Sequence, residues 1–174
     1  MANTYTLIQA QTLTTSAATV TFSSIPATYT DLVLRMSIRD TNTGATIGST
    51  TTTFNNDTTT LYSVTNLFGD GTTATSTRQS SVASWSSNYN ASNASVTVST
   101  FSSLEIYIPN YASTTSKAFS ESQAVENNAA STGTQIGARA RLYRNTSAIS
   151  SIEIAAYANF QTASSFYLYG IKNS

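Results

Sequence analysis

The stretch that decides the fold is DLVLRMSIR, residues 31–39, in which apolar and polar side chains alternate with a period of two. Leu32, Leu34, Met36 and Ile38 share one face, and Val33, Arg35, Ser37 and Arg39 share the other. Alternation of this kind predicts a β-strand that is buried on one side. We therefore expect a strand whose leucine face points into the core.

Similar segments follow along the chain and are separated by turn residues. The clearest is SLEIYI at 103–108, and Asp70-Gly71 indicates a tight hairpin turn. Residues 40–57 are polar and predict a long loop with at most one weak strand. The remaining expected strands lie at 4–8, 18–22, 58–68, 79–86, 117–125, 136–143, 149–158 and 165–171. Short strands without intervening helices predict one all-β domain over residues 1–174, an antiparallel, jelly-roll-like β-sandwich.

Composition supports this fold and narrows the function. Charged residues are only 9% of the chain and its net charge is zero, while Ser and Thr make up about a third. Threonine suits a pleated, half-buried surface. A neutral chain lacks the clustered basic surface of a nucleic-acid-binding protein. Low net charge also favours association, so we expect a protein that works in an assembly.

The sequence has no histidine and no cysteine, which removes the commonest general base and metal ligands. We therefore expect no enzyme, no cofactor and no metal. Two weaker alternatives remain. Glu105 and Glu153 could form a glycosidase pair, although an exposed cross-strand pairing with Arg139 or Arg141 is favoured. Oxygen ligands for calcium occur at Asn55, Asn56, Asp57 and Asp70, although Asp and Asn in turns usually bind their own backbone.

Two rows of side chains are candidates for an interface. Arg139, Arg141 and Tyr143 alternate with Ala138, Ala140 and Leu142, which predicts that the arginines point away from the core. Tyr167 and Tyr169 alternate with Phe166 and Leu168 on the last expected strand. Tyr and Arg are enriched at protein interfaces, although a core between two sheets could absorb either row.

Two motifs resemble β-sandwich proteins of tailed-bacteriophage virions, namely capsid cement or decoration proteins and tail-fibre modules. The first is SIPATYTDL at 24–32, with Ile25, Pro26, Tyr29, Asp31 and Leu32 at the matching positions. The second lies near the end of the chain, where a glycine often precedes the motif serine and Ala163 stands here. Its matching positions are Ile149, Ile152, Phe160, Ser164, Leu168, Tyr169, Gly170 and Ile171.

The resemblance implies a decoration protein that binds the major capsid protein and forms a homotrimer. The alternative is a host-recognition module that binds cell-surface glycan. No stretch near Met1 resembles a signal peptide and none is long and apolar enough for a membrane span, so synthesis in a host cytoplasm and a place on the capsid surface are expected.

Overall fold

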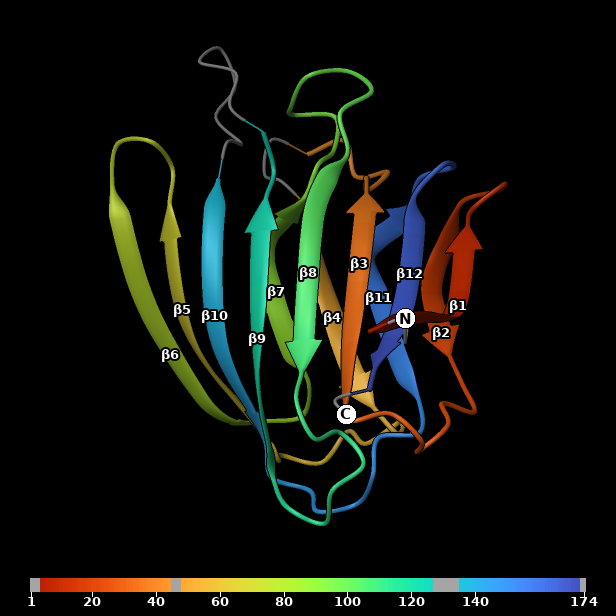
Figure 1. The fold of residues 1–174 in the computed structure, drawn as a ribbon. Coiled ribbons are helices and arrows are strands. Elements are labelled where there is room, and N and C mark those ends of the chain that lie inside the picture. Colours follow the sequence, from red (N-terminus) through yellow and green to blue (C-terminus); the bar gives the residue numbers. More distant parts are fainter. Residues whose placement is uncertain (1–3, 45–47, 127–134, 173–174) are drawn as a thin grey trace.

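The computed structural model describes residues 4–44, 48–126 and 135–172, and in these ranges it is an antiparallel β-sandwich. The larger sheet has eight strands and the smaller has four (Figure 1). In spatial order the larger sheet contains β1 (Tyr5–Thr12), β12 (Ser165–Ile171), β3 (Asp31–Ile38), β8 (Ser102–Ile108), β9 (Lys117–Ala124), β10 (Ile136–Tyr143), β5 (Tyr62–Gly69) and β6 (Ala74–Val82). The smaller sheet contains β2 (Ala17–Phe22), β11 (Ile152–Phe160), β4 (Gly48–Phe54) and β7 (Trp85–Ala91). The expected all-β sandwich is confirmed.

The core lies between the two sheets and follows the alternation of the strands. On β3, Leu32, Leu34, Met36 and Ile38 are all buried, as the sequence predicts, whereas Arg35 is exposed. An aromatic cluster fills one end of the core. Its members come from both sheets: Phe54 of β4 lies 4.5 Å from Trp85 of β7 and 5.3 Å from Phe119 of β9, between ring centroids. Aromatic pairs at these separations add to the free energy gained by burial.

Strand β4, Gly48–Phe54, lies within the segment 40–57, which was expected to be a long loop with at most one weak strand. It runs through a series of threonines, and Thr50 and Thr52 are buried against the other sheet. A buried hydroxyl needs a partner, and Thr50 accepts a hydrogen bond of 2.6 Å from the side-chain amide of Asn90 on β7. The single strand that the sequence allowed in this segment is therefore present, and its inward-facing threonines include one that is hydrogen-bonded to the neighbouring strand.

The hairpin between β5 and β6 closes at Asp70-Gly71, as predicted. The Asp70 carboxylate accepts hydrogen bonds from the backbone amides of Thr72 and Thr73, at 2.9 and 2.7 Å. These bonds lower the pKa of Asp70 to about 2. Gly71 has φ of 90°, a conformation that other residues rarely adopt. Beyond this turn, β6 is exposed on both faces along most of its length, because β5 and β6 extend sideways past the smaller sheet (Figure 1).

Nothing in the described ranges forms a helix that is long and apolar enough to cross a membrane.

Candidate contact surface

The predicted arginine row lies inside the sandwich, which corrects its expected orientation. Arg139, Arg141 and Tyr143 are 4%, 3% and 0% exposed, and Ala138 and Ala140 face solvent instead. Glu121 on the neighbouring strand β9 binds both guanidinium groups, at 3.1 Å from Arg139 and 2.7 Å from Arg141. The buried Glu121 carboxylate neutralises the charge of the buried arginines. Because Glu121 lies on another strand, the alternation along β10 alone could not reveal this.

Further contacts complete this interior polar cluster. Arg139 donates to the side-chain oxygens of Asn66 and Gln123, at 3.0 and 2.6 Å. The Arg141 guanidinium lies 5.5 Å from the centre of the Trp85 ring, at a distance suited to a cation–π contact. Burial lowers the pKa of Arg141 to about 10, an effect that Glu121 opposes. These residues therefore serve the interior and are not available to a partner.

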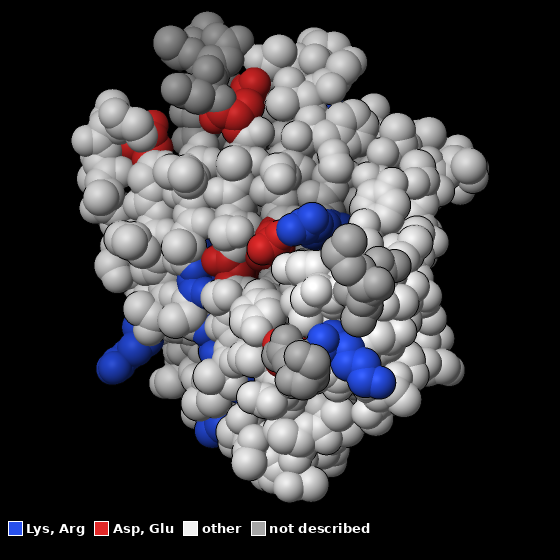
Figure 2. Space-filling view, in the orientation of Figure 1, with Lys and Arg blue, Asp and Glu red and all other residues white. Residues whose placement is uncertain are grey.

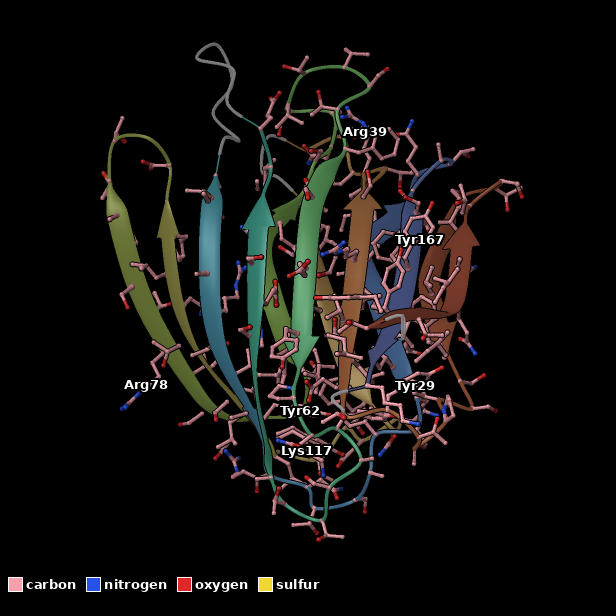
Figure 3. The ribbon with its side chains drawn as sticks, viewed as in Figure 1. Tyr29, Arg39, Tyr62, Arg78, Lys117 and Tyr167 are labelled. Atoms are coloured by element: carbon pink, nitrogen blue, oxygen red, sulfur yellow. The ribbon has the colours of Figure 1, made fainter. Side chains whose placement is uncertain are left out.

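Two other cations hold loops at opposite ends of the sandwich (Figure 3). Arg39 donates to the backbone carbonyls of Asn93, Thr97 and Thr100, which fixes the loop between β7 and β8. Lys117 is 1% exposed, and its ammonium group donates to the carbonyls of Ser113 and Ser147 at 2.8 and 2.7 Å. Burial lowers the pKa of Lys117. Like the interior arginines, both cations stabilise the chain's own fold.

The candidate calcium ligands are divided between the two ends of β5. Asp70 lies in the hairpin turn, whereas Asp57 accepts hydrogen bonds from the Tyr143 hydroxyl at 2.7 Å and the Asn145 amide at 3.1 Å. Asn55 binds the backbone of Ser150 and Ser151 through its side-chain oxygen. Within the described ranges, no group of three or more His, Cys, Asp or Glu side chains is arranged to hold a metal ion. The four residues therefore do not converge on one site.

The two candidate glycosidase carboxylates are also separated. Glu105 points outward from β8 in the larger sheet, and Glu153 points outward from β11 in the smaller sheet. Paired catalytic carboxylates lie about 5–10 Å apart, but these two lie on opposite outer faces of the sandwich. Glu105 is paired with Arg35 at 2.8 Å and not with Arg139 or Arg141. The two glutamates do not form a single site.

Tyr167 and Tyr169 do point outward from β12, as predicted, and Phe166 and Leu168 are buried. Side chains from β1, β3 and β8 join them on the outer face of the larger sheet. We call this region the tyrosine half: Tyr5, Leu7, Arg35, Glu105, Tyr107, Tyr167 and Tyr169. Tyr5, Leu7 and Tyr107 are 48%, 52% and 37% exposed. Val33 lies between Tyr107 and Tyr169 in register and is only 2% exposed, so large neighbours cover it.

The Arg35–Glu105 ion pair lies within the tyrosine half. Its side chains are 54% and 43% exposed, so the pair is available to a partner. The Arg35 guanidinium also lies 5.8 Å from the centre of the Tyr5 ring. The Tyr107 hydroxyl donates to Asp31 at 2.8 Å, and this bond raises the pKa of Tyr107. Rings, a guanidinium and a carboxylate together offer both apolar contact and directed hydrogen bonds.

The other half of this outer face carries mainly small side chains, and we call it the small-residue half. Among the outward positions of β9, β10, β5 and β6, which the structure describes in full, Arg78 is the one charged residue. The others are Ala118, Ser120, Ser122, Ala124, Ile136, Ala138, Ala140, Leu142, Ser63, Thr65, Leu67, Gly69, Ala74, Ser76 and Ser80. Figure 2 shows charged groups in a band across the middle of the molecule, with acidic groups near the upper edge and basic groups lower on both sides.

Within the small-residue half, Leu67 and Ile136 are 56% and 67% exposed and border a shallow apolar depression. Sequence reasoning missed these two residues, and it also missed Tyr5 and Leu7. The alternation in TYTLI at 4–8 places Tyr5 and Leu7 on one face, which was the available signal. The sequence offers no such signal for Leu67 and Ile136, because an isolated apolar residue in a strand is usually assigned to the core.

No protein-family model matches the chain, and no curated protein matches it closely enough to count as a relative.

Proposed function

We propose that this chain is a structural protein of a tailed-phage virion, a decoration protein that binds the major capsid protein shell. The observation that carries the proposal is the outer face of the larger sheet, whose small-residue half carries one charged residue, Arg78, and bears exposed Leu67 and Ile136. Contiguous exposed apolar surface of this kind marks protein contact sites. The motif resemblance supports a virion context, which would put the chain on the capsid surface.

The internal use of charge supports an assembly role. Arg39, Lys117, Arg139 and Arg141 all bind groups within the chain, although the sequence has only eight basic residues. The polar groups that remain exposed to water are therefore mainly Ser and Thr hydroxyls and not charged groups. Such a surface gives up little ionic solvation when it is covered by a partner.

Co-sedimentation with capsid shells tests this proposal. The shells are assembled from the major capsid protein of the genome that encodes the chain. We expect the wild type to sediment with the shells and Leu67→Asp to bind at least tenfold more weakly, since a charge would be buried without a partner. Tyr157→Ser is the matched control, because Tyr157 is 74% exposed on the smaller sheet. The proposal is wrong if the wild type stays in solution, or if only the control variant loses binding.

A second candidate is glycan recognition through the tyrosine half. The observation in its favour is that Tyr5 and Tyr107 expose ring surface beside Arg35 and Glu105, which can bind sugar hydroxyls. A glycan array probed with the wild type and with Tyr107→Ser tests this candidate. Binding that is lost in the variant supports glycan recognition, and an array without any signal argues against it.

A further inference from the structure

We propose that two copies of this chain pair through the outer faces of their larger sheets. The two-fold axis lies in the plane of contact and runs along the strands, between β3 and β8. A rotation about this axis brings β3 of one copy over β8 of the other, β12 over β9, and β1 over β10. Two properties of the face, charge and side-chain size, are self-complementary under this one operation.

The first property is charge. Arg35 on β3 and Glu105 on β8 are directly opposite in the register of the two strands, one on each side of the axis. The rotation therefore brings Arg35 over Glu105 of the second copy, and Glu105 over Arg35 of the second copy. The two ion pairs form a square of alternating charge, in which neither sign meets its like. Complementary charges of this kind fix the register of an interface.

The second property is side-chain size next to the axis. Tyr167, Arg35, Glu105 and Ser122 form one row across four neighbouring strands, and the rotation maps Tyr167 onto Ser122 of the second copy. In the adjacent row, Tyr169 maps onto Ser120 in the same way. Each large ring thus meets a small side chain, as interdigitation between packed sheets requires.

The same size relation holds one strand further out. Leu7 is opposite Tyr169 in the register of β1 and β12, and it maps onto Ala140 of the second copy. Ala10 maps onto Ala138, so two small side chains meet there, whereas Tyr5 maps onto Leu142 at the edge of the contact, where two larger side chains must pack side by side. The tyrosine half of each copy therefore packs on the small-residue half of the other.

The size of the contact suits a stable pair. Six strands at a spacing of about 4.8 Å, each roughly 20 Å long, give about 600 Å² per copy. Stable interfaces bury about 800 Å² per partner, so the face approaches the usual size. Strands β5 and β6 lie outside the overlap, which leaves Leu67 free to contact a shell. A zero net charge removes long-range repulsion between copies.

The contact closes at two copies, because one face packed on a copy of itself is isologous. The structure thus favours a dimer where the resemblance implies a trimer, since a ring of three joins two different patches. The inference does not depend on the virion role. If the chain pairs but does not bind shells, the dimer stands and the proposed decoration role is wrong.

Charge reversal combined with mixing tests the pairing. Sedimentation velocity at high micromolar concentration is expected to give the wild type twice the chain mass of 18.5 kDa. Arg35→Glu alone and Glu105→Arg alone each bring like charges together across the axis, so each should sediment as a monomer. An equimolar mixture of the two variants restores both attractive contacts and should sediment as a dimer.

Matched controls separate this contact from other causes. Arg78→Glu reverses a charge on the same face but outside the overlap, so it should leave the dimer intact. Ser122→Trp adds bulk at an exposed position where Tyr167 of the second copy would lie, and it should weaken pairing at least tenfold. Each variant should melt at a temperature close to the wild type, which shows that it is folded.

Several outcomes overturn the inference. They are a wild type that remains a monomer, or that sediments as a trimer. A mixture of the two charge variants that stays monomeric while the wild type pairs also overturns it. So does glycan binding at Tyr107 by a chain that never pairs, because the tyrosine half would then serve another partner.

Discussion

The ring of Tyr29 lies against the backbone of Gly170, so the segment that leads into β3 packs directly on β12. The backbone amide of Thr30 also donates to the carbonyl of Ile171, at 2.7 Å. Tyr29 belongs to the first of the two motifs quoted from the sequence and Gly170 to the second. The two motifs are therefore parts of one packing unit, although about 140 residues separate them in the sequence.

Gly170→Ala should destabilise the fold by about 1–3 kcal/mol, because a Cβ at this position would overlap the Tyr29 ring. Gly69→Ala is the matched control, since a Cβ there would meet nothing closer than 3.8 Å. Urea denaturation of both variants gives the comparison. Equal midpoints for the two would show that the Tyr29 contact does not exclude a side chain.

Ala163→Gly should stabilise the fold by about 0.5–1 kcal/mol. Ala163 has φ of 72°, in the left-handed region that favours glycine. The gain is reduced by the greater freedom of glycine in the unfolded chain. Thermal melting measures the effect, and a lower melting temperature for the variant would contradict it.

Glu121→Gln should cost about 3–5 kcal/mol, because it leaves two buried arginines without a counter-charge. Glu105→Gln removes the exposed partner of Arg35 and should cost less than about 1 kcal/mol. The free energy of unfolding of each monomer, measured at low protein concentration, separates the two cases. A small loss in Glu121→Gln would mean that the interior cluster contributes little.

The same cluster shows where sequence reasoning stops. Alternation identified β3, β8 and β12 and their buried faces, because each presents apolar side chains on one side. On β10 the two faces carry Ala138 and Ala140 against Arg139 and Arg141, and the rule places the alanines inside. The opposite holds because Glu121 on another strand neutralises the arginines. That compensation depends on strand pairing, which a single sequence does not display.

The candidate site was predicted in part for a related reason. Tyr167 and Tyr169 were found because Phe166 and Leu168 between them are plainly apolar. The opposing small-residue half was not found, since Ser120, Ser122 and Ala138 carry no signal of their own. Only the register of the paired strands shows that these residues belong to the proposed contact surface, because it places them in the same rows as Arg35 and the tyrosines.

Asp57→Asn should lower stability most at neutral pH, and the difference from wild type should shrink in acid. Hydrogen bonds, the strongest from the Thr59 hydroxyl, hold the pKa of Asp57 below its ordinary value of 3.8. A carboxylate with a depressed folded pKa stabilises above the unfolded value, and this contribution is lost as pH falls through 3.8 and below. Melting temperatures from neutral pH to about pH 2 test this. A gap between variant and wild type that stays constant over this range would show that the charge of Asp57 is not responsible.

Thiol labelling of single-cysteine variants tests the central claim, that the outer face of the larger sheet is the contact surface. The natural chain has no cysteine, so Ser122→Cys and Thr21→Cys each introduce one reactive group. Both positions are exposed, Ser122 on the larger sheet and Thr21 on the smaller. In the presence of shells at high micromolar chain concentration, we predict slow labelling at Ser122→Cys and fast labelling at Thr21→Cys. Fast labelling at Ser122→Cys would contradict the account, and protection at Thr21→Cys would place the contact on the smaller sheet instead.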